Sequence, residues 1–303
     1  MTNTGNISNE ASTASEHKTR SFIGIACGIA SVLLFSSFTL VSKVGFASSL
    51  KLIDIAAIRF TIAGALMAPV LFHFGLQGIR ARDALALTFT GGVGFALLAY
   101  SGFSMAPASH GAVLLHGTLP LFSSLFAFFV LSRRPNVVRV IGLIAIFLGI
   151  VCMAWDSLIT STLRQLIGDG FLLLASICWS AYGLLAQRFG LKPAHSASIV
   201  AVLSAVCYLP VYVFLPGKEV LLVGWRELLI QGSFQGVLIG VGSIFVYSQA
   251  VARLGAIETA LFTAAVPCIT TVTAIFLLNE MPGAFAIVGV VMVTLGMAVA
   301  MRH

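Results

Sequence analysis

The chain has 303 residues, of which 59% are hydrophobic and 9% charged, and its mean hydropathy is +1.05. Soluble domains carry about 25% charged residues, so this composition excludes a soluble globular protein and predicts a polytopic membrane protein. The net charge of +7 comes from Lys and Arg that stand singly or in pairs between apolar stretches. That scatter excludes a nucleic-acid-binding surface and is typical of the signals that orient membrane helices.

Residues 1–20 are polar and lack the apolar core of a signal peptide, so we expect a disordered cytoplasmic tail. Ten apolar segments follow, each close to the roughly 20 residues that cross the hydrocarbon core. Each is about twice the length of a barrel strand, and a backbone in lipid must satisfy its own hydrogen bonds, so we predict helices. Their expected limits are 22–42, 53–74, 84–106, 109–131, 137–155, 170–189, 196–215, 231–252, 257–278 and 284–301.

The connections between these segments are too short for a soluble domain. The connection 216–230 is amphipathic around Trp225-Arg226-Glu227, and we expect it to lie at the membrane interface. Lys and Arg outside the helices gather on the side that holds the tail and the connections 75–83, 132–139 and 188–195. This bias predicts that both termini of this multi-pass protein are cytoplasmic.

Two stretches of the chain, 100–153 and 247–300, are copies of one another at a constant offset of 147. We therefore predict a first repeat at 21–156 and a second at 157–303, each with five helices. Because five is odd, the copies have opposite orientations, a plan common in secondary transporters. The coincident residues are Tyr100 and Tyr247, Pro120 and Pro267, Pro135 and Pro282, Gly142 and Gly289, and Gly149 and Gly296. Each glycine pair is seven residues apart in its helix, which predicts close packing of the fifth and tenth helices.

Several short motifs carry a resemblance to a known family: Phe35-Ser36-Ser37, Ala57-Ile58-Arg59-Phe60, the two mid-helix prolines, and Leu278-Asn279-Glu280. In this order they resemble the drug/metabolite transporter superfamily, in its ten-helix EamA-type branch. The resemblance implies a carrier of small organic solutes in the inner (plasma) membrane, with a cavity between its halves lined by helices 1, 3, 4, 6, 8 and 9. The chain departs from the family where Arg133 replaces the usual Glu, and where the second repeat has Ser204 or Ala205 in place of Arg59.

An ionisable side chain within a membrane span is costly, so it faces a cavity or a partner by default. His116 stands one turn before Pro120 and is a candidate for proton coupling or ligand gating. A neutral histidine hydrogen-bonded across the bundle is the alternative. His110 is nearer a helix end, where it could sit at the interface. The near absence of carboxylates in the middle of the expected spans argues against an Asp or Glu proton relay.

Aromatic and polar side chains of the helices expected around the cavity are the candidate substrate ligands. Aromatic faces bind planar or cationic solutes, although the same residues could simply pack the repeat interface. Tyr100 and Tyr247 would lie near opposite membrane faces, as alternating gates or as part of an interfacial tyrosine belt. The candidates are His116, Tyr100, Trp179, Tyr182, Phe38, Ser37, Gln235, Tyr247, Gln249 and Thr263.

Four further residues are expected to have structural or hinge roles. Pro120 and Pro267 would break their helices. Arg59 is expected to snorkel or to pin a carboxylate, with attraction of an anionic group as the functional alternative. Glu280 would pin the turn between the ninth and tenth helices.

The sequence contains no catalytic motif and no phosphate-binding loop, and its five cysteines lie in apolar segments without CxxC spacing. We therefore expect neither an enzyme nor an ATP-driven pump, and no cofactor or metal. The predicted function is alternating-access secondary transport of a small organic solute, such as an amino acid or related metabolite, in the export direction. The alternatives are cationic-drug efflux, solute uptake, and a channel or non-transporting scaffold. Coupling to a proton or counter-solute, and a homo-oligomer, are left open.

Overall fold

The computed structural model is helical throughout the part of the chain that it describes, which is 22–42, 50–107, 110–132, 134–160, 162–220, 222–278 and 284–301. Within those residues, nine helical spans are long and apolar enough to cross a membrane, and a shorter apolar helix follows near the end of the chain. The prediction of an all-α membrane protein with ten spans is confirmed.

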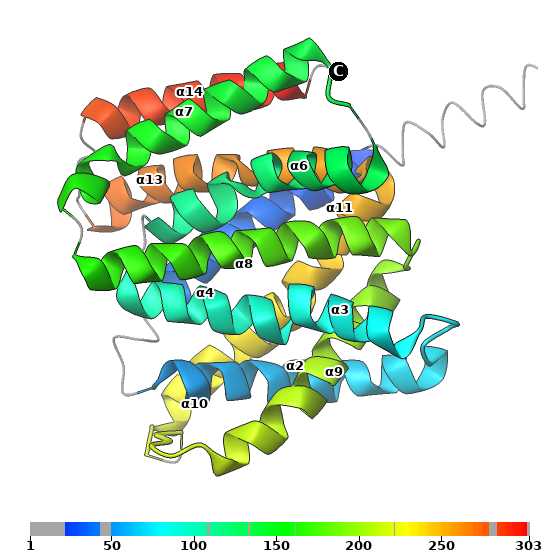
Figure 1. Ribbon diagram of the computed structural model, residues 1–303. Helices are drawn as coiled ribbons and strands as arrows, with labels where there is room; N and C mark the ends of the chain where they lie inside the picture. The colour runs from blue at the N-terminus through cyan, green and yellow to red at the C-terminus, as the bar shows by residue number, and fades with distance from the viewer. Residues whose placement is uncertain are drawn as a thin grey trace, which may run out of the picture.

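The ten spans are built from continuous and broken helices, as Figure 1 shows. The first span is Phe22–Ser42 and the second is α2 (Leu52–Phe74). The remaining spans are α3 (Ala81–Gly91) with α4 (Val93–Met105); η1 (Gly111–Gly117) with α6 (Leu119–Leu131); α7 (Val137–Thr160); α8 (Leu163–Arg188); α9 (Pro193–Phe214); α10 (Trp225–Gln231) with η2 (Gly232–Ser243) and α11 (Ile244–Leu254); α12 (Ala256–Thr263) with α13 (Ala265–Leu278); and α14 (Ala284–Ala300).

The two prolines of the repeat mark breaks at matching places in the fourth and ninth spans. The fourth span changes from the π-helix η1 to α6 at Thr118, and Pro120 occupies the first turn of α6. The ninth span changes from α12 to α13 at Ala264, three residues before Pro267. Because proline lacks an N–H and is tolerated in a first helical turn, each residue starts a new segment in mid-membrane.

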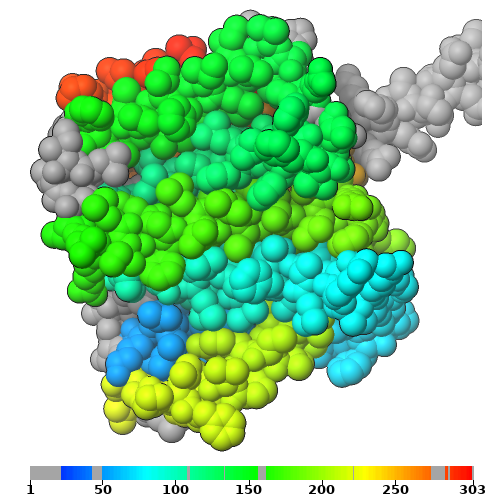
Figure 2. All heavy atoms as spheres, in the orientation of Figure 1, coloured from blue at the N-terminus to red at the C-terminus, as the bar shows by residue number. Residues whose placement is uncertain are grey.

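The spans are arranged in layers between two helix pairs. Figure 1 shows α7 beside α14 at one edge of the bundle and α2 beside α9 at the opposite edge, with α4, α6, α8 and α13 between them. Large apolar side chains cover the lateral surface, including Phe129 and Phe214, which are 70% and 87% exposed. Figure 2 shows this surface, where α7, α8 and α3 lie in successive bands. Such a surface is stable in lipid.

The α7–α14 pair shows how the two halves are related. A Cβ on Gly142 would lie 2.6 Å from the Gly296 carbonyl oxygen, and a Cβ on Gly149 would lie 2.8 Å from that of Gly289. The helices are therefore antiparallel, and the two contacts exchange when each residue is replaced by its copy 147 positions away. This is the pairing expected of inverted repeats, and the predicted packing role of the glycines is confirmed.

Two helix starts differ from the sequence prediction. The sixth span begins at Leu163 rather than near 170, because the Thr162 side chain caps it by accepting from the Gln165 N–H (3.3 Å) and Gln165 bonds back to the Thr162 N–H (2.7 Å). The eighth span begins earlier than predicted, at Trp225-Arg226-Glu227 rather than near 231, and the expectation that these residues lie at the membrane interface stays a prediction. These residues open α10, which continues without a break into η2.

Candidate functional site

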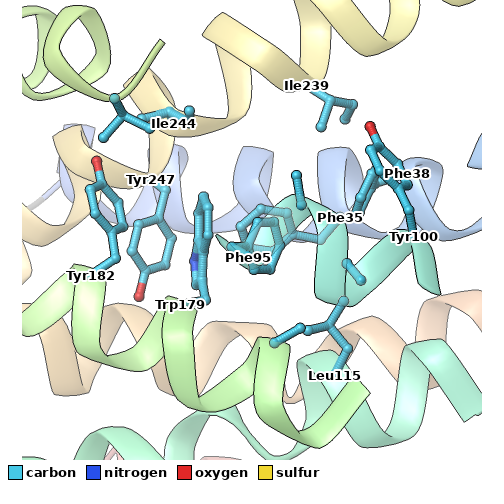
Figure 3. Packing of buried hydrophobic residues seen from close by; sticks show 14 of the residues in the cluster. Phe35, Phe38, Phe95, Tyr100, Leu115, Trp179, Tyr182, Ile239, Ile244 and Tyr247 are labelled. Atoms are coloured by element: carbon cyan, nitrogen blue, oxygen red, sulfur yellow. The ribbon is translucent and has the colours of Figure 1, made fainter. Parts of the chain in front are cut away.

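A row of buried aromatic rings crosses the centre of the bundle, and we call it the aromatic row. In space it runs from Tyr182 and Tyr247 through Trp179, Phe95 and Phe35 to Phe38 and Tyr100 (Figure 3). Neighbouring ring centroids are 4.6 Å apart for Phe95 and Trp179 and 6.3 Å apart for Tyr182 and Tyr247. None of these rings is more than 3% exposed.

Glycines on neighbouring helices make room for the rings at one end of this row. A Cβ on Gly91, at the break between α3 and α4, would lie 2.5 Å from the Tyr182 ring. A Cβ on Gly183 of α8 would lie 2.8 Å from the Tyr247 hydroxyl oxygen. Any larger residue at either position would push a ring out of the row, so the helix break serves the site directly.

The centre of the aromatic row lies where the two repeats meet. Thr263 donates a hydrogen bond to the His116 carbonyl oxygen (3.1 Å), and these residues are copies of one another, 147 positions apart. Phe35 and Trp179, which match between the first and sixth spans, are also in contact, with centroids 5.5 Å apart. A residue can touch its own copy only near the axis that relates the two halves.

Polar atoms without partners surround Phe35 at this axis. The His116 ring stacks on Phe35 with centroids 5.0 Å apart, and Tyr247 lies 5.9 Å from Phe35. Both ring nitrogens of His116, the Trp179 indole nitrogen and the Tyr247 hydroxyl are buried, and none has a hydrogen-bond partner among the described residues. A buried polar group left unpaired costs about 1–3 kcal/mol. We call Phe35, His116, Trp179 and Tyr247 the central cluster; its free donors and acceptors suit a polar ligand.

The Tyr100 end of the row carries a buried cation. Tyr100 donates to the Gln235 side-chain oxygen (3.0 Å), and the Gln235 amide nitrogen donates to Ser42 Oγ (3.2 Å). Arg59 is 1% exposed, and its guanidinium carbon lies 5.6 Å from the centroid of the Phe38 ring. The Tyr100 hydroxyl is close to this guanidinium. Even so, neither terminal nitrogen of Arg59 makes a hydrogen bond within the described parts of the chain.

The Tyr182 end of the row lies beneath a cavity of about 520 Å³. The cavity lies where α8 meets α9 and where α11 meets α12, and it is lined by Ala186, Gln187, Gly190, Leu191, Lys192, Pro193, Ser248, Val251, Ala252, Arg253, Leu254 and Gly255. The Tyr182 hydroxyl bridges the lining residue Ser248 (2.7 Å) and Ser196 of α9 (2.9 Å). The cavity therefore ends at the aromatic row.

The structure brings most of the predicted site residues together. His116, Trp179, Tyr182 and Tyr247 lie at the axis and the cavity end, and Phe38, Tyr100 and Gln235 at the other end. Three predicted ligands point elsewhere. Ser37 donates to the Leu33 carbonyl oxygen (2.7 Å) of its own helix, Gln249 accepts from Arg253 (3.3 Å), and Thr263 is occupied by backbone oxygens. Glu280 lies outside the described residues.

Burial narrows the roles expected of three predicted residues. Tyr100 and Tyr247 are both 0% exposed, so neither belongs to an exposed tyrosine belt. They lie at opposite ends of the aromatic row, and their role as alternating gates stays a prediction. Arg59 does not snorkel, because it faces the bundle interior, and no ion pair joins it to a carboxylate of the described residues.

The expected near absence of mid-membrane carboxylates stays a prediction, but two carboxylates in the first two turns of their helices are buried. Asp54 in α2 and Asp169 in α8 are 0% and 5% exposed. Asp169 Oδ1 lies 2.7 Å from Nδ1 of His110, which is buried rather than interfacial. The sequence prediction placed Asp169 in the connection before the sixth span, because it started that span at 170. The capping box formed by Thr162 and Gln165 is the sequence signal that could have placed it inside.

The fold and the buried site define a multi-pass membrane protein made of two inverted halves with a common polar and aromatic centre. The chain belongs to the EamA-like transporter family, which it matches over residues 22–155 and 166–302, and it is therefore a membrane transporter.

Similar proteins support this family and fold. The uncharacterized transporter YyaM of Bacillus subtilis (strain 168) is 28% identical over 259 residues, which cover 81% of this chain and 83% of YyaM. An uncharacterized transporter of Clostridium kluyveri is 21% identical over 61% of each chain. A protein of known crystal structure superposes on 91% of this chain and 96% of its own length with a TM-score of 0.67 at 20% identity, which shows a common fold.

Proposed function

We propose that the protein is an alternating-access secondary carrier that moves a small organic solute, such as an amino acid or a related metabolite, across the inner membrane in the export direction. The observation that carries this proposal is the pairing of a cavity at one end of the bundle with a buried, repeat-symmetric aromatic row. A carrier needs a central site that communicates with one side at a time, and this arrangement is suited to that task.

The distribution of Lys and Arg supports the orientation. The cavity opens beside Gly190 and Gly255, at the end of the bundle that this distribution assigns to the cytoplasm together with both termini. With this orientation, the structure is the inward-facing arrangement of the carrier, with its cavity towards the cytoplasm. The repeats 21–156 and 157–303 are the two halves that rock about the central cluster, and the breaks before Pro120 and Pro267 supply the hinges.

Cysteine accessibility tests the mechanism. Ala252 lines the cavity, and its copy 147 residues earlier is Met105, at the end of α4. In a background without the five native cysteines, Ala252→Cys and Met105→Cys should react with an impermeant thiol reagent in opposition, one becoming protected as the other becomes reactive when substrate is added. Simultaneous reactivity of both positions under every condition would favour a channel.

Counterflow in proteoliposomes tests the substrate class. We expect exchange of radiolabelled amino acids, and failure across amino acids, polyamines and drugs would count against a carrier. Cationic-drug efflux is the second candidate because aromatic faces attract cations. However, the guanidinium of Arg59 already lies at the Phe38 ring, so this end of the row is unsuited to another positive charge.

A further inference from the structure

We infer that Arg59, together with Tyr100 and Gln235, forms an anion-binding subsite that takes the carboxylate group of the transported solute. The inference rests on the proposed carrier function and adds the chemical class of its substrate. It depends on four observations: the burial of the guanidinium, its lack of a carboxylate partner among the described residues, the polar groups held beside it, and its presence in only one repeat.

The burial of Arg59 is the first observation. Its side chain is 1% exposed and projects from α2 into the core of a membrane protein, where water cannot compensate its charge. Such a charge is normally paired or faces a solute pathway. Arginine cannot escape this cost by losing its proton at any ordinary pH. The Phe38 ring, 5.6 Å from the guanidinium carbon, offers a partial partner that carries no charge.

The two buried carboxylates of the described spans are already engaged by other groups. Asp54 is on the same helix, but its Oδ1 accepts from the Tyr212 hydroxyl (2.6 Å) and its Oδ2 from the backbone N–H of Lys51 and Glu219 (3.2 Å each). Asp169 pairs with His110. Within the described residues, both terminal nitrogens of Arg59 therefore lack a hydrogen-bond partner, and these are the atoms that bind a carboxylate in bidentate fashion.

The surroundings of Arg59 are organised as a polar site. Gln235 uses its oxygen for Tyr100 and its nitrogen for Ser42, so the Tyr100 hydroxyl is held beside the guanidinium. Gln235 lies in η2, a π-helix, and such segments recur at functional sites. Gly240 of the same segment lets α2 approach closely, since a Cβ there would lie 2.8 Å from the Cβ of Ala63 and 3.4 Å from Arg59 Cγ.

The charge is present in one repeat only. The matching position of the second repeat is Ser204 or Ala205, and neither carries a charge. A single guanidinium balances the single negative charge of a carboxylate, whereas a phosphate ester carries nearly two. With its carboxylate at Arg59, a substrate would extend along the aromatic row towards the central cluster. This arrangement fits a monocarboxylate whose remaining part is apolar or aromatic and carries a polar group for His116, Trp179 or Tyr247.

The test compares matched ligands that differ only in their terminal group. Purified full-length protein is titrated with carboxylates, the corresponding neutral amides and the corresponding primary amines, including 3-phenylpropanoate, 3-phenylpropanamide and 3-phenylpropylamine, and binding is read from thermal stabilisation. The wild-type protein should prefer the carboxylate over its amide by about tenfold or more. Arg59→Gln should abolish this preference and keep binding of the amide, and Arg59→Lys, which keeps the charge without the planar fork, should retain part of it.

Arg139→Gln is the matched control, because Arg139 pairs with Glu258 (3.1 Å) away from the aromatic row, and its loss should leave the preference unchanged. The inference is overturned if the wild-type protein prefers amides or amines, or if no carboxylate of the panel stabilises it. These results do not depend on how well the Arg59 variants fold. An equal carboxylate preference in Arg59→Gln also overturns it. If counterflow of an amine or amide persists in those cases, the carrier proposal survives; if no solute exchanges, that proposal fails separately.

Discussion

Replacing Tyr182 with phenylalanine tests whether the cavity end of the aromatic row controls access. The Tyr182 hydroxyl lies 2.9 Å from Ser196 Oγ of α9 and 2.7 Å from Ser248 Oγ of α11, so it joins two helices that border the cavity. Phenylalanine removes both hydrogen bonds. It keeps the ring and its packing against Trp179 and Tyr247, whose centroids are 5.2 and 6.3 Å away.

The size of the effect follows from the two lost hydrogen bonds. A neutral intramolecular hydrogen bond contributes about 0.5–1.5 kcal/mol net, so the inward-facing arrangement should lose roughly 1–3 kcal/mol. In the proposed carrier, closing the cavity moves α9 relative to α11, and this movement breaks the bridge through Tyr182. Because the bridge then stabilises only the arrangement with an open cavity, its loss should shift the equilibrium away from that arrangement by about 5- to 150-fold.

The assay is the labelling rate of Ala252→Cys, a cavity-lining position, measured with and without Tyr182→Phe. We expect slower labelling in the double variant and faster labelling at its repeat copy, Met105→Cys. Tyr208→Phe is the matched control, because the Tyr208 hydroxyl donates to the Ile53 carbonyl oxygen (2.9 Å), away from the cavity. It should lower thermal stability without altering labelling. Unchanged labelling in Tyr182→Phe, with a loss of stability like that of Tyr208→Phe, would refute a gating role.

Three other substitutions test packing, the buried ion pair and coupling. Gly142→Ala should lower stability by about 1–3 kcal/mol, because its Cβ would meet the α14 backbone at 2.6 Å. A Cβ at Gly170 has no atom within 4 Å, so Gly170→Ala should be neutral or stabilising. Thermal unfolding in detergent measures both variants, and equal losses of stability would contradict this packing. Asp169→Asn should destabilise by roughly 1–3 kcal/mol and the more exposed Asp83→Asn by far less, by the same measurement. His116→Ala should weaken substrate binding but leave the pH profile of counterflow unaltered, since no described carboxylate pairs with His116; an altered profile would instead assign proton coupling to this residue.

The sequence was sufficient to predict the arrangement of the helices because that arrangement occurs twice in the chain. An offset of 147 predicted which residues correspond, and inversion then required that some corresponding residues meet. The contact between Thr263 and His116, and the reciprocal approach of Gly142 to Gly296, are consequences of that requirement. The prolines predicted the helix breaks because a missing N–H has the same effect in any tertiary context.

The site was less predictable because the spans are apolar on every side. In a soluble helix the polar face reveals which side chains point inward, but a membrane span lacks this contrast. The sequence therefore gave the depth of Arg59 and Ser37 along their helices without showing that Arg59 faces the core and that Ser37 bonds to its own backbone. Asp169 was placed outside its span for another reason: the predicted start of α8 was about two helical turns too late.

The two halves match in their aromatic packing but differ in one buried charge, and this difference affects how the transporter works. Pairs such as Phe38 with Tyr100 and Tyr182 with Tyr247 are images of one another, so two arrangements of the halves can be nearly equal in energy. Arg59 has no such image, and it lies at the end of the row away from the cavity. An anion held there would be bound with different affinity in the two arrangements, which biases their populations. That bias affects the rate and affinity on each side, while net direction follows the gradients of the solute and of any counter-solute, because a binding site alone supplies no driving force.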